Sequence, residues 1–344
     1  MSTNSSTSSE THANPLRIGR HMLRNRAVLA PMSGVSDLPF RRISARFGAG
    51  MVVSEMVASE SLVKGDAETQ MRAEAQERGL HVVQLAGRRP HWMGEAAKIA
   101  AGAGADIIDI NMGCPAKKVT SGYSGSALMR DLDHALTLIE ATVEAVDVPV
   151  TLKMRLGWDE HSLNAPELAC RAESAGVQLI TVHGRTRCQF YQGQADWAAI
   201  RKVKQAISLP LIANGDCRGC DDAVAMLEAS GADGVMIGRG AYGRPWLPGH
   251  VGHYLATGER LTDPDGTELT DLMIAHYEAI ISHYGAMAGV RIARKHLGWY
   301  LDGPARDVSV PGQLRKTLMT SFDPGEVIRL VEDCLSSNST RSAA

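Results

Sequence analysis

The side chain with the clearest chemical potential in this sequence is the thiol of Cys114. An apolar run, Ile107–Ile110, ends in a short polar segment in which Gly113 precedes the cysteine and Pro115 follows it. Glycine allows a tight turn, and proline biases the residue before it away from helical geometry. A free cysteine is most often a small buried side chain. A strand end, a turn, a thiol and two nearby lysines together favour a reactive site instead.

Short apolar runs with the length of buried strands alternate with longer amphipathic segments. The eight runs are Val28–Pro31, Met51–Ser54, His81–Leu85, Ile107–Ile110, Val148–Lys153, Leu179–His183, Pro210–Ala213 and Gly234–Ile237. Apolar strands separated by helices predict a parallel sheet covered by those helices. Eight such units, without a dinucleotide-binding glycine motif after the first strand, predict a (β/α)₈ TIM barrel rather than a doubly wound sheet. Glycines between helix and strand, such as Gly176 and Gly231, fit left-handed helix caps.

Polar residues follow nearly every predicted strand, at the end where a barrel of this kind carries its active site. They are Ser33, Gln84, Asn111, Lys153, Arg155, His183, Asn214, Asp216 and Arg239. Lys153 is the most informative, because a strand register buries it and a buried lysine is costly without an anion. Gln84 and His183 taken singly are equally compatible with ordinary core positions.

Glycine-containing turns after the seventh and eighth strands predict a phosphate site. Gly215 and Gly238 let backbone amides approach an anion, and Arg239 adds a fixed cation beside them. One phosphate cradle together with a central lysine describes a site for FMN. The nearby pair Cys217 and Cys220 lacks a second pair or a histidine at zinc spacing, so no metal is predicted.

The composition is that of an ordinary soluble protein of 344 residues, 44% hydrophobic and 22% charged. The net charge of -2 creates no global field for nucleic acid, so such a partner needs a local basic face. Six scattered cysteines indicate a reduced, cytoplasmic protein, and no apolar run approaches the ~20 residues of a membrane span. Residues 1–14 and 337–344 are small and polar, and they are expected to be disordered tails rather than a secretory signal. A monomer is expected.

The chain is predicted to divide into a barrel, residues 15–260, and a smaller helical domain, residues 261–336. The predicted helices of that domain are Leu269–Tyr284, Gly289–Leu301, Gly312–Met319 and Pro324–Leu335, behind a linker at 263–266. The segment 286–318 contains six Arg or Lys against two Asp, with Trp299 and Tyr300 among them. Alternating basic and aromatic residues suit an RNA backbone and its unstacked bases. A solvated helix face with core aromatics is the alternative that charge leaves open.

Several motifs, in this order along the chain, resemble those of the tRNA-dihydrouridine synthases. They are Leu-Ala-Pro-Met-Ser-Gly-Val-Ser-Asp-Leu-Pro-Phe-Arg (29–41), Asp-Ile-Asn-Met-Gly-Cys-Pro-Ala-Lys-Lys-Val (109–119), Thr-Leu-Lys-Met-Arg-Leu-Gly-Trp (151–158), Thr-Val-His-Gly-Arg-Thr-Arg (181–187), Ile-Ala-Asn-Gly-Asp (212–216) and Met-Ile-Gly-Arg-Gly-Ala-Tyr-Gly-Arg-Pro-Trp (236–246). The segment Arg-Ile-Ala-Arg-Lys-His-Leu-Gly-Trp-Tyr (291–300) is similar to the bacterial B-type subgroup. The resemblance runs from about Arg17 to about Cys334 and is highly specific.

The resemblance implies a flavin-dependent reduction of the C5–C6 double bond of a uridine in the tRNA D-loop. FMN would be the cofactor, NADPH the reductant and Cys114 the proton donor. The implied FMN-binding residues are Pro31, Met32, Ser33, Gln84, Lys153, His183, Asn214, Gly215, Asp216, Gly238 and Arg239. The expected tRNA contacts are Asn111, Lys117, Lys118, Arg155, Arg294, Lys295 and His296. The target base would have to leave its stack to reach the barrel mouth.

Two other functions remain open on the residues alone. An FMN barrel that reduces or oxidises a free pyrimidine would share the flavin and cysteine chemistry, but it would not need the basic helical domain. A non-enzymatic RNA-binding regulator would bind tRNA without carrying a flavin.

Overall fold

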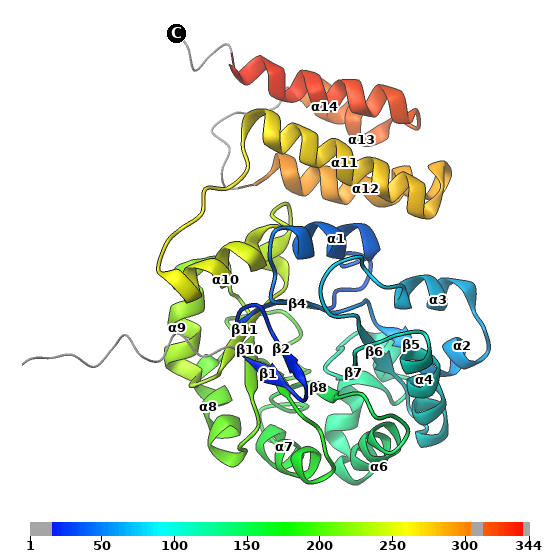
Figure 1. Ribbon diagram of the computed structural model, residues 1–344, viewed down its shortest axis with the longest axis vertical. Helices are drawn as coiled ribbons and strands as arrows, with labels where there is room; N and C mark the ends of the chain where they lie inside the picture. The colour runs from blue at the N-terminus through cyan, green and yellow to red at the C-terminus, as the bar shows by residue number, and fades with distance from the viewer. Residues whose placement is uncertain (1–15, 304–311, 340–344) are drawn as a thin grey trace, which may run out of the picture.

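The computed structural model describes residues 16–303 and 312–339, which form a parallel β-barrel with a helical unit packed beside it (Figure 1). The barrel strands are β3 (Ala27–Leu29), β4 (Met51–Val52), β6 (Val82–Ala86), β7 (Ile107–Met112), β8 (Val150–Arg155), β9 (Ile180–His183), β10 (Leu211–Asn214) and β11 (Gly234–Ile237). These coincide with the eight predicted runs. A further short strand, β5 (Val57–Ala58), pairs with the end of β6.

Hydrogen bonding continues around the whole sheet. Neighbouring strands pair in parallel in the order β4-β3-β11-β10-β9-β8-β7-β6-β5. The ring closes between Val53, directly after β4, and Val82 at the start of β6, where the Ser54 N–H donates to the Val82 carbonyl at 3.0 Å. The predicted (β/α)₈ barrel is therefore confirmed, and all strand C-termini meet at one mouth.

Helices cover the outside of the barrel. They are α1 (Leu38–Arg46), α2 (Ser59–Val63), α3 (Ala67–Ala73), α4 (Pro90–Gly102), α6 (Leu132–Val143), α7 (Ala165–Ser174), α8 (Trp197–Ala206), α9 (Cys220–Ser230) and α10 (Leu247–Thr257). Asp37, Asp131 and Asp196 cap three of them, each accepting a backbone N–H from three residues further on. At the C-terminal end of α9, Gly231 adopts the left-handed conformation with φ 66°, as its position between helix and strand predicted.

The interior of the barrel is a packed apolar core. Val28, Ile107 and Ile212 are fully buried within it. A hairpin of β1 (Arg17–Ile18) and β2 (His21–Met22) closes the bottom and adds Ile18 to the same cluster. The sequence analysis did not predict this hairpin. The hairpin thus covers the bottom of the barrel and the core fills its centre, while the C-terminal ends of the strands meet at the mouth.

The helical unit consists of α11 (Gly266–Tyr284), α12 (Ala286–Leu301), α13 (Gly312–Thr320) and α14 (Pro324–Ser339). Figure 1 shows α11 and α12 beside α1, with α13 and α14 on the outer side. Ile43 of α1 and Trp246 from the barrel belong to its apolar core. The preceding linker is tied to the barrel, because Asp263 accepts hydrogen bonds from Arg244 and His250. In the described parts of the chain, no helix is both long and apolar enough to cross a bilayer.

Candidate active site

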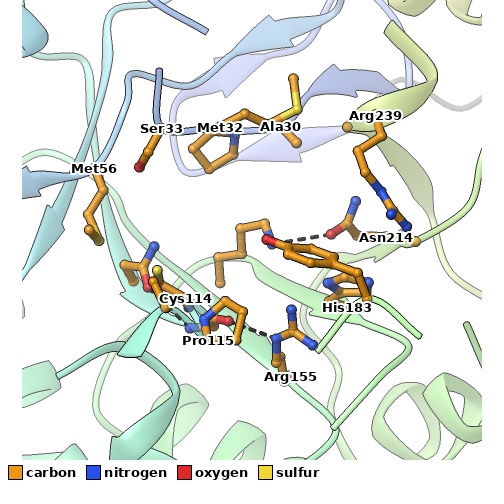
Figure 2. A pocket seen from close by; sticks show the side chains of 18 of the residues that line it. Ala30, Met32, Ser33, Met56, Cys114, Pro115, Arg155, His183, Asn214 and Arg239 are labelled. Atoms are coloured by element: carbon orange, nitrogen blue, oxygen red, sulfur yellow. Dashed lines mark hydrogen bonds between the residues drawn. The ribbon is translucent and has the colours of Figure 1, made fainter. Parts of the chain in front are cut away.

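A cavity of about 720 Å³ occupies the barrel mouth (Figure 2). It brings together Cys114 and all the residues expected to bind FMN, namely Pro31, Met32, Ser33, Gln84, Lys153, His183, Asn214, Gly215, Asp216, Gly238 and Arg239. In Figure 2, Met32 and Ser33 face Cys114 and Arg155 across the cavity, and Arg239 lies toward one end. The mouth therefore combines a thiol, a lysine and an arginine-bearing end, as the strand ends predicted.

Below the cysteine, a chain of hydrogen bonds runs through the barrel wall. Asp109 accepts from the Thr151 hydroxyl at 2.6 Å and from the Gln84 amide at 2.7 Å. The Gln84 carbonyl accepts from the amide of Asn111 at 2.7 Å, and Asn111 Oδ1 in turn accepts from the Cys114 N–H at 3.0 Å. Burial raises the pKa of Asp109 to about 6, although the Thr151 and Gln84 bonds act in the opposite direction. Through these hydrogen bonds, Asp109 orients the side chain of Gln84, Gln84 orients that of Asn111, and Asn111 holds the backbone of Cys114.

Asn111, expected to contact tRNA, lines the cavity, and that contact stays a prediction. Its amide and its carbonyl are both used within the wall, and the residue is buried. Asn111 therefore positions the cysteine loop. On the far side of that loop, the Ser126 hydroxyl donates to the Cys114 carbonyl at 2.8 Å. The Cys114 backbone is held from both sides, while its half-buried side chain lines the cavity.

Arg155, also expected to contact tRNA, lines the cavity, and that contact stays a prediction. The side chain is 1% exposed and donates to the carbonyls of Gly113, Thr186 and Phe190, each at 2.8 Å. Burial lowers the pKa of Arg155 to about 10. Its position on β8 directs the side chain inward. There it connects the cysteine loop, at Gly113, with the loop after β9, at Thr186 and Phe190. Three of the five guanidinium N–H donors therefore bind backbone carbonyls, and Arg155 supports the site from inside.

Lys153 lies near the centre of the mouth with unused hydrogen-bonding capacity. Its ammonium has three N–H donors, and the one hydrogen bond described for it goes to Asn214 Oδ1 at 3.2 Å. Burial and the charge of Arg155 lower the pKa of Lys153 to about 8, with Asp109 opposing them. The group is still mostly protonated at neutral pH. It can therefore supply positive charge and hydrogen bonds to a ligand in the cavity.

His183 is neutral and has a defined tautomer. Burial, followed by the charges of Arg155 and other cations, holds the pKa of His183 well below its ordinary value. Its Nε2 lies 3.3 Å from Nη1 of Arg185. Because arginine can only donate, Nε2 accepts and the ring proton is on Nδ1. His183 therefore presents a fixed polar edge beside the cavity.

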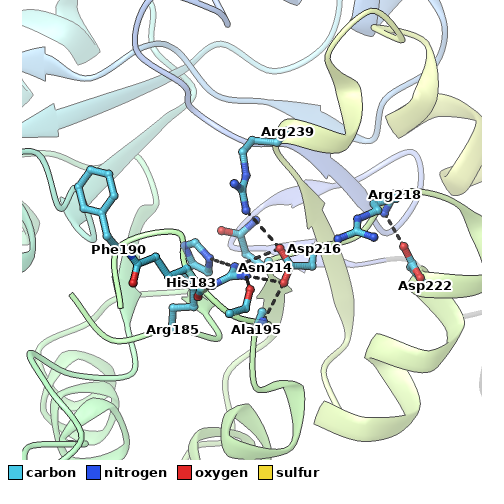
Figure 3. Close-up of polar contacts among 12 residues, drawn as sticks. His183, Arg185, Phe190, Ala195, Asn214, Asp216, Arg218, Asp222 and Arg239 are labelled. Carbon is cyan, nitrogen blue, oxygen red and sulfur yellow. Dashed lines mark hydrogen bonds and ion pairs between the residues drawn. The ribbon is translucent and has the colours of Figure 1, made fainter. Parts of the chain in front are cut away.

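The arginine-bearing end of the cavity is organised by Asp216 (Figure 3). Its carboxylate accepts two bonds from Arg185, at 3.1 and 2.6 Å, and one from Arg239 at 3.3 Å. Partial burial alone would raise the pKa of Asp216, but the hydrogen bonds from Arg185 and from the Ala195 N–H lower it. Arg185 stood at a predicted strand end without an assigned role. The structure makes it the buried anchor of this end, with Asp216 orienting Arg239.

At this end of the cavity, glycines let neighbouring segments of backbone approach each other closely. Gly215 has φ 120°, and a Cβ there would lie 2.7 Å from the Cβ of Ala195. Gly240 approaches the neighbouring loop so closely that a Cβ would lie 2.3 Å from the Cys217 carbonyl oxygen. The turn η2 (Arg239–Ala241) begins here, and the first amides of such a turn have no carbonyl partner inside it. Cys217 is buried in this wall, which raises the pKa of its thiol to about 12.

The sequence analysis missed the aromatic loop after β9. Tyr191 lines the cavity, with the guanidinium carbon of Arg239 4.9 Å and that of Arg155 5.5 Å from its ring centroid. The adjacent Phe190 has φ 54°, which is unusual for a non-glycine residue. Nothing in the local sequence distinguishes this loop from an ordinary exposed turn. Met56, from the loop before β5, also lines the cavity and was not predicted.

Three further residues, Lys117, Lys118 and Arg294, were expected to contact tRNA. Lys117 is exposed on the short helix α5 (Lys117–Thr120), and the side chain of Lys118 lies outside the described part of the structure. Arg294 donates to the carbonyls of Thr320 and Ser321 at 3.0 and 3.2 Å. Its charge therefore faces α13 and the turn after it.

His296, also expected to contact tRNA, is buried, and its contact with RNA stays a prediction. The ring is 2% exposed, with centroids 5.7 Å from Phe40, 4.9 Å from His276 and 5.2 Å from Trp299. Burial holds the pKa of His296 well below its ordinary value, so the ring is neutral. It packs the helical unit against α1.

Lys295 points from the helical unit toward the barrel. A Cβ built on Gly34 would lie 3.5 Å from Lys295 Nζ, and the Gly34 N–H donates to Glu55. Burial lowers the pKa of Lys295, while the carboxylates of Asp37 and Glu55 act to raise it. This lysine therefore faces buried acids at the junction between barrel and helices.

Comparisons with known proteins agree on one family. Residues 28–340 match the family model described as Dihydrouridine synthase (Dus). The probable tRNA-dihydrouridine synthase of Rhizobium leguminosarum bv. phaseoli is 60% identical over 305 residues, which cover 89% of this chain and 93% of that protein. The tRNA-dihydrouridine synthase B of Klebsiella pneumoniae is 45% identical over 318 residues, covering 92% and 98%.

Solved structures resemble this one at much lower identity. Histamine dehydrogenase from Rhizobium sp. 4-9 has a TM-score of 0.56 at 14% identity, covering 95% of this chain and 64% of that one. An old yellow enzyme homologue from Zymomonas mobilis has a TM-score of 0.51 at 16% identity, covering 74% and 95%. At these identities the likeness concerns the fold alone.

Proposed function

The chain belongs to the dihydrouridine synthase family, and on that premise we propose that it reduces a uridine of the tRNA D-loop, with FMN as its flavin, NADPH as the reductant and Cys114 as the proton donor. The observation that carries this proposal is the setting of Cys114. Its backbone is fixed by Asn111 and Ser126, and its thiol lines the same cavity as Lys153. A cytoplasmic enzyme with tRNA as its partner fits this chemistry.

The mouth suits FMN in both size and donor set. Its volume of about 720 Å³ lies within the range of cofactor pockets. Lys153, with donors to spare, would hold the polar edge of the ring, where positive charge stabilises the reduced form. The turns at Gly215 and Gly238, with Arg239, would hold the phosphate. When bound, FMN supplies the hydride for uracil C6 after its reduction by NADPH.

The chain's own part in the reduction is to donate a proton. Cys114 Sγ gives its proton to C5, which balances the hydride that C6 receives. The hydrogen bonds with Asn111 Oδ1 and with the Ser126 hydroxyl hold the Cys114 backbone, so that little orientation would be lost when the base arrives. The target base would enter the mouth unstacked, and Tyr191 offers an aromatic face there.

The test separates the two halves of the reaction. In Cys114→Ala, flavin binding and flavin reduction by NADPH should be nearly unchanged, because Lys153 and the phosphate turns remain. Reoxidation of the reduced flavin by tRNA should slow by about 10²–10⁴-fold, the usual contribution of a positioned general acid. Stopped-flow absorbance at the flavin band resolves both steps. The matched control is Cys188→Ala, which removes an exposed thiol from a neighbouring loop.

Two results would contradict the proposal. Reoxidation of Cys114→Ala at the wild-type rate would remove the thiol from the chemistry. Release of FAD, or of no flavin, from the purified protein would remove FMN, and mass analysis of the released cofactor decides this.

A further inference from the structure

A basic cluster without an assigned role stands on the loop that follows β6. Arg88 and Arg89 come directly after Gly87, at the C-terminal end of the strand that places Gln84 in the cavity. Both arginine side chains are exposed. The loop is fixed from below, because Nε2 of His134 lies 2.9 Å from the Arg88 carbonyl oxygen. The two guanidinium groups are therefore presented at the rim of the mouth by an anchored backbone.

The charge around this loop is positive. Lys64 of α2 forms an ion pair with Glu60 at 2.6 Å. The Lys64 hydrogen bond and charge lower the pKa of Glu60, and the charges of Arg89 and Arg88 add to that effect. One carboxylate thus faces three cations. In residues 16–303 and 312–339, no hydrogen bond or ion pair involves either guanidinium.

Other acids near the loop are already engaged. Asp133 is paired with Arg171 at 2.6 Å, and Glu95 with Lys98 at 2.8 Å. Asp131 accepts the N–H that caps α6. The two arginines therefore keep their donors available.

We propose that the cluster of Lys64, Arg88 and Arg89 binds phosphates of the RNA backbone and extends the tRNA footprint to the β6 side of the barrel mouth. The inference rests on the proposed function, because a base can enter the cavity only if its flanking phosphates cross the rim. Planar guanidinium groups with free donors match phosphate geometry. In Figure 1, the helical unit packs against α1, and α2 and α4 lie on a different side of the barrel from α1. The cluster and the helical unit would therefore hold the RNA from different sides.

The experiment measures tRNA affinity of the flavin-loaded protein as salt rises from about 50 to 200 mM. Each phosphate contact contributes roughly 0.7–0.9 to the slope of log K against log salt. The double variant Arg88→Gln, Arg89→Gln should lower the magnitude of that slope by about 1–2 and weaken binding about tenfold at low salt. Flavin content and the rate of reduction by NADPH should stay at wild-type values, which shows that the fold is intact.

The matched control places the same charge change at the other end of the barrel. Arg17 and Arg20 lie on the exposed hairpin below the core, and Arg17→Gln, Arg20→Gln should leave the slope unchanged. An unchanged slope in the Arg88, Arg89 variant, or an equal fall in the control, would overturn the proposal. Wild-type dihydrouridine formation in the same tRNA is measured alongside. If the wild-type protein forms no dihydrouridine, the proposed function fails. If the wild-type protein is active but the Arg88, Arg89 variant keeps the wild-type salt slope, only the proposed phosphate site fails.

Discussion

The barrel mouth and the helical unit both bury basic side chains, and they do so in opposite ways. In the mouth, each buried polar group has a hydrogen-bonding partner, as Arg155 has with three carbonyls. In the helical unit, no hydrogen bond from the described residues reaches either ring nitrogen of His296. His276 and His296 pack there as neutral rings among aromatic neighbours. Polar residues position a reaction in the first region, and histidines fill a core in the second.

The most sensitive way to break the ordered network of the mouth is to remove Asn111. Asn111→Ala deletes the acceptor of the Cys114 N–H, and it should slow flavin reoxidation by tRNA about 10²-fold, as a displacement near 1 Å can. Stopped-flow absorbance measures the rate. Asn164→Ala is the control, because the side chain of Asn164 also binds the backbone, where it donates to the Met129 carbonyl, but not next to the thiol. Equal rates for Asn111→Ala and wild type would mean that the thiol is positioned by other contacts.

How far the sequence predicted these regions depends on what each prediction required. The end of a strand can be recognised from a short stretch of sequence. The apolar runs therefore sufficed to predict the barrel mouth and to place Cys114 and Lys153 there. Whether a basic side chain is buried or exposed to a ligand depends on hydrogen-bond acceptors that are distant in the sequence. Arg155 is bound by carbonyls 31 and 35 residues away, at Thr186 and Phe190, and charge patterning contained no sign of them.

The same limit applies to the predictions made for the helical unit. A basic run on α12 indicated an RNA face, but a helix has two faces, and the sequence does not state which one meets α1. The ring of His296 lies on the packed face, against Phe40 of α1. The hairpin of β1 and β2 was missed because strands of two residues have no periodicity to detect.

The two regions should respond to acid in opposite directions. Burial lowers the pKa of His276 from 6.5 to about 3, so below pH 6.5 the unfolded chain binds a proton that the folded chain does not. The free energy of unfolding should therefore fall by about 2 kcal/mol per such histidine between pH 6.5 and pH 5. Asp109 has a raised pKa, about 6, and its contribution grows as pH falls toward its unfolded value.

Urea unfolding at pH 7 and pH 5 measures this difference. In His276→Leu, the free energy of unfolding should fall less between pH 7 and pH 5 than in the wild type. Losing the 3.0 Å contact with the Tyr300 hydroxyl lowers stability equally at both pH values, so it does not affect this difference. Asp109→Asn should make the fall steeper, because it removes the opposing group. An unaltered pH dependence in His276→Leu would show that the histidine core does not set the acid response.

The smallest expected effect lies at the junction where the two regions meet. Lys295 of the helical unit faces Glu55 of the barrel, and Glu55 accepts the Gly34 N–H in the loop that also lines the cavity at the barrel mouth through Ser33. If the two charges interact, Lys295→Met and Glu55→Gln should not be additive. A double-mutant cycle on the free energy of unfolding should give a coupling of about 1 kcal/mol, within the range for contacting residues.

This cycle also decides which region Lys295 serves. A lysine that bound RNA would contribute to the salt dependence of tRNA affinity, and Lys295→Met would lower that slope by about 0.7–0.9. A lysine that faces Glu55 leaves the slope unchanged and couples to Glu55→Gln instead. Lys316→Met, on the exposed surface of α13, supplies the comparison of an equal charge loss without a barrel partner. Strict additivity together with a reduced salt slope would return Lys295 to the RNA surface and would leave the junction to apolar packing around Ile43 and Trp246.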